Sequence, residues 1–137
     1  MAAPYRYLDH TADLGIEVFG RTFEELLINI GKAIFETQIK GNVREQTSVT
    51  FQLEAESQED LFIEWCRELL YMFSVKQFIP VRYSIELEHL SLRAELHGDI
   101  LDPRRHTVRI EIKNPTYHEF QIKKMPELLS ATIIFDV

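Results

Sequence analysis

Carboxylates near both ends of the sequence are the first groups that could do chemistry. Asp9 and Asp13 bracket segment 9–13, which reads DHTAD. On an extended chain these two residues would lie about 13 Å apart, so they cannot bind one ion together unless the segment curls. A turn between two strands is the alternative interpretation, because Asp and Thr side chains stabilise turns by hydrogen bonds to the backbone.

The last two residues form a second carboxylate group. Asp136 precedes Val137, so the terminal carboxylate lies beside an aspartate side chain at the end of an apolar strand. Hard oxygen ligands of this kind suit Ca²⁺, Mg²⁺ or Mn²⁺. The alternative is that Asp136 only solubilises an exposed strand end. The residues alone leave both interpretations open.

A third group consists of His97, Asp99, Asp102 and His106. Two imidazoles and two carboxylates could ligate a transition metal, and a metal-dependent phosphoester hydrolase could be built on such a site. The spacing lacks the H-x-x-x-H and C-x-x-C patterns of zinc sites, and Asp102 followed by Pro103 also fits an ordinary turn. A metal site and a turn are therefore competing predictions for this stretch.

Composition narrows the classes of function. The chain has 137 residues, 45% hydrophobic and 27% charged, which is typical of a folded globular protein, and we expect one domain over residues 1–137. The net charge is −7, from 15 basic and 22 acidic residues. This charge argues against binding of RNA phosphates by an overall positive protein surface. The single cysteine, Cys66, excludes an internal disulfide. Without a long apolar run to suggest a membrane segment or signal peptide, we expect a cytoplasmic protein with no membrane contact.

Two amphipathic helices must help to position these groups. Thr22 and Glu25 have the spacing of a capping box, in which each side chain accepts a hydrogen bond from the other residue's backbone. Apolar residues then follow at three- and four-residue steps as far as Ile34. Ser57 precedes a second helix, whose wider apolar stripe includes Cys66 and indicates deeper burial.

Alternation of apolar and polar residues predicts strands around the two helices. The last strand is apolar on both faces, which indicates a central position in its sheet. We therefore predict an α+β fold with two helices packed on a mostly antiparallel or mixed sheet, including an N-terminal strand–helix–strand unit. The predicted strands are 5–8, 15–19, 46–55, a hairpin after Pro80 that reverses near His89, 108–112, 117–123 and 131–137.

Several pieces of the sequence, taken in order, resemble the archease family. The segment DHTAD followed by LGI at 14–16 is similar to the N-terminal hallmark of that family. The sequence departs from the family pattern at Asn114-Pro115, where a small and an aliphatic residue are usual, and it lacks an aromatic residue near 128–129. The other matching pieces are TFEEL at 22–26, ELLY at 68–71, GD at 98–99, Asp102 with Arg104 and His106, Lys113 with TYH at 116–118, and IFDV at 134–137.

The resemblance implies an archease-like fold and the role of a protein cofactor, not an enzyme. Archeases activate the RtcB-type RNA ligase in tRNA splicing and RNA repair, where they promote guanylylation of the ligase and multiple turnover. The resemblance implies contact with RNA only through the ligase.

The resemblance also implies a site for a divalent cation, calcium in the family, with magnesium or manganese as alternatives. Asp13, Asp136 and the carboxylate of Val137 would bind this ion, and Asp13, Lys113 and Asp136 would act on the ligase. Two alternatives stay open: the hydrolase described above, and a chaperone-like binding module whose metal is incidental.

Overall fold

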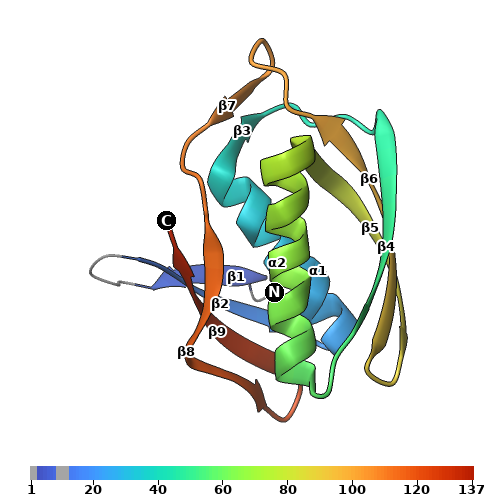
Figure 1. Cartoon of the computed structure of the whole chain (residues 1–137). Coiled ribbons are helices and arrows are strands. Elements are labelled where there is room, and N and C mark those ends of the chain that lie inside the picture. Colours follow the sequence, from blue (N-terminus) through green and yellow to red (C-terminus); the bar gives the residue numbers. More distant parts are fainter. Residues whose placement is uncertain (1–2, 9–12) are drawn as a thin grey trace.

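The computed structural model describes residues 3–8 and 13–137, which form two helices and a set of antiparallel strands (Figure 1). In chain order the elements are β1 (Tyr5–Leu8), β2 (Leu14–Gly20), α1 (Phe23–Gln38), β3 (Ile39–Gly41), β4 (Thr47–Glu54), α2 (Gln58–Lys76), β5 (Phe78–Glu88), β6 (Ser91–Ile100), β7 (His106–Val108), β8 (Asn114–Lys124) and β9 (Leu129–Asp136).

The strands of the described ranges form three sheets instead of the one sheet that we predicted. A four-stranded sheet has the order β1-β2-β9-β8, a three-stranded sheet has the order β4-β6-β5, and β3 pairs with β7. All pairings are antiparallel. Figure 1 shows the two helices between the four-stranded and the three-stranded sheets. The α+β class with two helices is confirmed, but the helices are covered by sheets on two sides.

This arrangement explains the wide apolar stripe of α2. On one side Phe62 stacks on Phe120 of β8, with ring centroids 5.0 Å apart. On the other side Trp65 contacts Phe51 of β4 at 5.7 Å and Tyr83 of β5 at 6.3 Å. A helix with a sheet on each side must bury more than one face, since both contacts exclude water.

Both helices begin at the residues that the capping patterns indicate. Thr22 accepts a hydrogen bond from the Glu25 N–H at 3.1 Å, and Ser57 accepts one from the Asp60 N–H at 3.1 Å. The Glu25 carboxylate accepts from the N–H of Arg21, one residue before the expected partner. Each cap is worth about 1 kcal/mol, because it pairs a helix N–H that has no partner within the helix.

The central position predicted for the last strand is confirmed. β9 lies between β2 and β8, and the side chains of Ile133 and Phe135 are fully buried. The two strands of the predicted N-terminal strand–helix–strand unit lie in different sheets. The first, β2, pairs with β9 in the four-stranded sheet, whereas the second, β4, pairs with β6 in the three-stranded sheet.

Of the strand predicted over 108–112 only Val108 lies in a strand, and segment 109–113 is not part of any strand. β7 ends at Val108, and the Arg109 N–H donates to the Gln38 carbonyl at 2.7 Å. The Ile112 N–H donates to the Gln38 side-chain oxygen at 2.9 Å. A buried glutamine at the end of α1 thus takes the place of a neighbouring strand, and the segment leads directly to Lys113.

Candidate functional site

The pairing of β2 with β9 brings the first and last parts of the chain together. Leu14 lies opposite Phe135 and Gly15 opposite Ile134 in an antiparallel register. Continued by one residue, the same register sets Asp13 across from Asp136. The N-terminal segment and the last strand are therefore sheet neighbours, as an ion shared by Asp13 and Asp136 would require, and both aspartates lie at one end of the four-stranded sheet.

Lys113 lies at the same end of the sheet. Its N–H donates to the Asp136 carbonyl at 2.8 Å, and the next residue, Asn114, is the register partner of Asp136. Lys113 and Asp136 are exposed, Asp13 is half-buried, and Val137 is 39% exposed. We call Asp13, Asp136 and Val137 the acidic corner. The sheet register, together with the Gln38 contacts to segment 109–113, places Lys113 next to it.

The donor atoms of the acidic corner have the chemistry that a hard cation requires. Asp13 and Asp136 contribute carboxylate side chains. Calcium takes six to eight oxygen ligands, some of which can be carbonyls and water. Among residues 3–8 and 13–137, no three His, Cys, Asp or Glu side chains gather as a metal group. A cation at the acidic corner would therefore need main-chain or water oxygens as further ligands. Asp9, the other aspartate of segment 9–13, lies outside the described residues.

The histidine–aspartate group has a different role in the structure. Asp99 is 1% exposed, and its carboxylate accepts hydrogen bonds from Arg105 Nη1 at 2.6 Å and Nη2 at 3.1 Å. It also accepts from the backbone N–H of Arg44 at 3.0 Å and of Ile100 at 2.9 Å. The Arg105 guanidinium and these N–H groups hold the pKa of Asp99 well below its usual range, against the opposing effect of burial.

The two histidines of this group lie in different surroundings. His106 is buried, its Nδ1 accepts from the Asp102 N–H at 2.9 Å, and its Nε2 is 2.9 Å from the Asn42 carbonyl, to which it donates. His97 instead has its Nε2 3.1 Å from Glu95 on the same strand. Asp99, Asp102 and His106 are thus brought together with their polar atoms engaged by protein groups. This favours the turn interpretation over a hydrolytic metal site.

Gln38 is the positioning residue that the sequence analysis missed. Its side chain is fully buried, and it fixes the segment that leads to Lys113. A signal was present, because Gln38 continues the spacing of Ile30 and Ile34 along the buried face of α1. A polar residue in such a stripe must find a hydrogen-bond partner in the core.

No helix within the described ranges has a long enough apolar stretch to cross a membrane.

Comparison with known proteins agrees with this fold and with the motifs in the sequence. The family model described as the archease protein family (MTH1598/TM1083) matches residues 5–137. The chain is 30% identical over 139 aligned positions to Protein archease of Methanosarcina acetivorans, covering 97% of this chain and 95% of that protein. It is 27% identical over 128 positions to Protein archease of Pyrococcus furiosus, covering 90% of each.

Two solved structures have the same fold. The solution structure of protein 1598 of Methanobacterium thermoautotrophicum superposes with a TM-score of 0.76 at 23% identity, over 98% of this chain and 99% of that one. The crystal structure of a Thermotoga maritima protein, described as an archease and possible chaperone, gives a TM-score of 0.71 at 25% identity, over 100% and 98%. Since the family match, the sequence relatives and the fold all agree along nearly the whole chain, this protein belongs to the archease family.

Proposed function

We propose that this protein activates an RtcB-type RNA ligase, and that it does so through a divalent cation bound at the acidic corner. The observation that supports the proposal best is the register of β2 with β9, in which Leu14 lies opposite Phe135. Continued by one residue, it would bring Asp13 and Asp136, more than a hundred positions apart in the sequence, close enough to bind one ion, as the resemblance to archeases requires. The ligase partner itself is inferred from family membership.

The residues of the acidic corner and Lys113 would have different roles. Asp13, Asp136 and the carboxylate of Val137 would hold the ion, with calcium as the expected metal and magnesium or manganese as alternatives. The ion supplies positive charge that favours phosphoryl-type transfer. Lys113, whose backbone N–H donates to the Asp136 carbonyl, would contribute a second positive charge at this end of the sheet. In this proposal the reacting groups belong to the ligase, and this chain acts on them as a protein cofactor.

The charge of the chain is consistent with indirect action on RNA. With a net charge of −7, this protein is a poor binder of the phosphate backbone. An acidic activator can instead approach a basic ligase that holds the RNA, and opposite charge speeds such an encounter. We therefore expect RNA to be bound by the ligase and not by this chain.

The test is a ligation assay with an RtcB-type ligase in the presence of GTP and Mn²⁺. Substoichiometric wild-type protein should convert a single round of ligation into many rounds. Asp13→Asn and Asp136→Asn should abolish this effect while circular dichroism stays unchanged. Glu88→Gln, at an exposed position by the β5–β6 turn, is the matched control and should retain full activity. Full activity in both corner variants would refute the assignment of the site.

A second function, a chaperone-like binding module, is favoured by the description of the Thermotoga maritima relative as a possible chaperone. Residues added after Val137 separate the two functions, because they remove the terminal carboxylate from the corner. The activator proposal requires calcium affinity, measured by calorimetry, to fall together with ligase turnover. If turnover is unchanged while calcium binding is lost, the metal is incidental and the chaperone-like function is the better account.

A further inference from the structure

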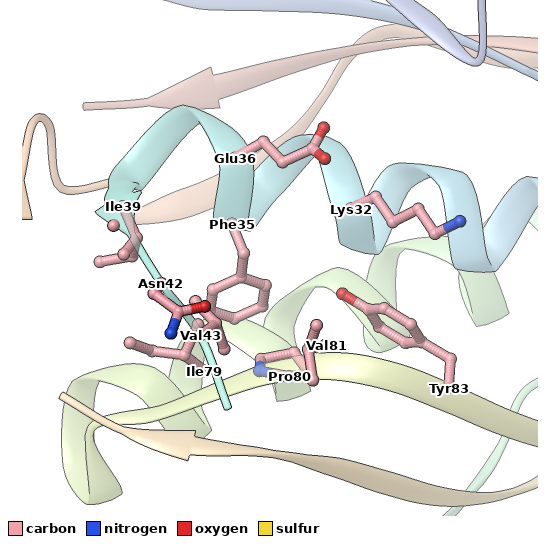
Figure 2. Close-up of a pocket in the computed structure, with 11 residues that line it drawn as sticks. Lys32, Phe35, Glu36, Ile39, Asn42, Val43, Ile79, Pro80, Val81 and Tyr83 are labelled. Carbon is pink, nitrogen blue, oxygen red and sulfur yellow. The ribbon is translucent and has the colours of Figure 1, made fainter. Parts of the chain in front are cut away.

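A second site lies between α1, β3 and β5, and it is separate from the acidic corner. The cavity has a volume of about 380 Å³ (Figure 2), within the range of ~300–1,000 Å³ that is usual for small-molecule sites. Its wall includes the buried apolar side chains of Phe35, Ile39 and Ile79, and Val81 lies exposed at its edge. The acidic corner shares no residue with this lining.

A buried hydroxyl at the wall of the cavity lacks a hydrogen-bond partner. The Tyr83 oxygen is inaccessible to solvent, and nothing in residues 3–8 and 13–137 forms a hydrogen bond with it. Figure 2 shows the ring of Tyr83 reaching from β5, with the hydroxyl directed toward Phe35 among the lining side chains. Burial and the nearby Glu36 carboxylate raise the pKa of Tyr83, so its hydroxyl stays protonated and can donate.

A glycine in α1 makes room for this tyrosine. A Cβ atom at Gly31 would lie 2.8 Å from Cε2 of Tyr83 and 3.2 Å from its hydroxyl oxygen. Glycine inside a helix lowers helix stability, and here it lets the ring lie directly against the helix backbone. The position of the hydroxyl is therefore fixed by the packing of β5 on α1.

The charges at the rim cancel one another. Lys32 and Glu36, one turn apart on α1, are both exposed and both line the cavity. One oxygen of Glu36 already accepts a hydrogen bond from the Tyr5 hydroxyl at 2.6 Å. Because the rim carries one positive and one negative group, it does not select a charged ligand.

We propose that this cavity binds a small neutral molecule with an apolar body and one hydrogen-bond acceptor, and that the exposed side chains at its edge move aside on binding so that the acceptor reaches the Tyr83 hydroxyl, which donates to it. The apolar wall supplies the area that such a ligand buries. Tyr83 supplies selectivity, because only a ligand with an acceptor gives this donor the hydrogen bond that it lacks in the free protein.

Acetophenone and α-methylstyrene test the proposal, since they have nearly the same shape and only the first carries an acceptor. Titration followed by ¹H–¹⁵N NMR should show shifts at Phe35, Val81 and Tyr83 for both. Acetophenone should bind roughly 3- to 10-fold more tightly, as expected for one hydrogen bond. In Tyr83→Phe this preference should disappear, whereas Tyr71→Phe, at an exposed tyrosine of α2, should keep it.

Thermal unfolding of Tyr83→Phe without ligand gives an independent readout. If the hydroxyl has no partner in the free protein, its removal leaves Tm unchanged or raises it. Three results would overturn the proposal: equal affinity for the two probes, a preference that survives in Tyr83→Phe, or a clear fall in Tm for this variant. None of them depends on the ligase assay.

Discussion

Replacing Arg105 by leucine tests whether the group of Asp99, Asp102 and His106 stabilises the fold. Arg105 donates two hydrogen bonds to the carboxylate of Asp99, which is almost completely buried. The Arg105→Leu substitution keeps most of the side-chain volume but leaves the Asp99 charge without its cation. The alternative, a hydrolytic site, would require the carboxylate to be available to a metal.

The expected loss of stability follows from the contacts that remain. Removing one partner of a buried ion pair typically costs about 3–5 kcal/mol. Two backbone N–H groups, of Arg44 and Ile100, still donate to Asp99 in the variant. We therefore expect a loss of about 3 kcal/mol, at the lower end of that range. Arg104→Leu is the control: its side chain is 89% exposed, so its pair with Asp102 contributes at most about 1 kcal/mol.

The loss should depend on pH with a defined sign. In the wild type the pKa of Asp99 is lowered, most strongly by Arg105, so the stability from this charge is present above the unfolded pKa of about 3.9 and is lost as the pH falls. In Arg105→Leu the pKa rises, because burial now opposes ionisation with less compensation. The difference between wild type and variant should be largest near pH 7 and shrink toward pH 3.

Urea unfolding at both pH values provides the measurement. The only tryptophan of the chain, Trp65, is fully buried and reports unfolding by fluorescence. A loss below about 1 kcal/mol at pH 7, or a difference that does not change with pH, would refute the assignment of Asp99 and Arg105 as a buried structural pair.

Three shorter predictions follow from other parts of the fold. Gly98→Ala should lower stability by more than about 2 kcal/mol in urea unfolding, because a Cβ there would lie 2.0 Å from the Ile79 carbonyl oxygen. Cys66, buried with a raised pKa, should react with a thiol reagent only when the protein is unfolded, as absorbance would show. Asp60→Asn should lower the pKa of Tyr117, since burial and then the Asp60 carboxylate raise it; ultraviolet titration measures the pKa. The substitution should cost less than about 1 kcal/mol, because Asp60 is only half-buried and its partner Tyr117 is exposed.

Each of these predictions has a result that contradicts it. Stability close to that of the wild type in Gly98→Ala would mean that β5 can move away from β6. Rapid labelling of Cys66 in native conditions would mean that α2 opens locally. An unchanged pKa of Tyr117 in Asp60→Asn would show that the 3.0 Å hydrogen bond between the two side chains is not formed in solution.

Much of the local structure could be predicted because it depends on neighbours in the sequence. Thr22 and Ser57 accept hydrogen bonds from residues three positions ahead, so a short pattern is enough to locate both helix starts. The apolar stripe around Cys66 predicts a buried helix, and the two apolar faces of the last strand predict its central place. Each of these features is decided by periodicity and capping.

The parts that failed depend on contacts between distant segments. The alternation of Val108, Ile110 and Ile112 is that of a strand, yet the Gln38 side chain pairs with the Ile112 N–H and replaces the strand ladder. The division into separate sheets also followed from pairings that no local pattern specifies, such as β3 with β7.

The sequence by itself determined the net negative charge of the chain, the presence of carboxylates near both of its ends, and the residues at which the two helices begin. Only the tertiary structure decided which of them meet. The pairing of β2 with β9 brings the strand that follows Asp13 beside the strand that ends at Asp136, and Asp99 forms a buried ion pair with Arg105. The physical reason is that capping and periodicity act over a few residues, whereas strand register and buried ion pairs join residues that only the folded core brings together.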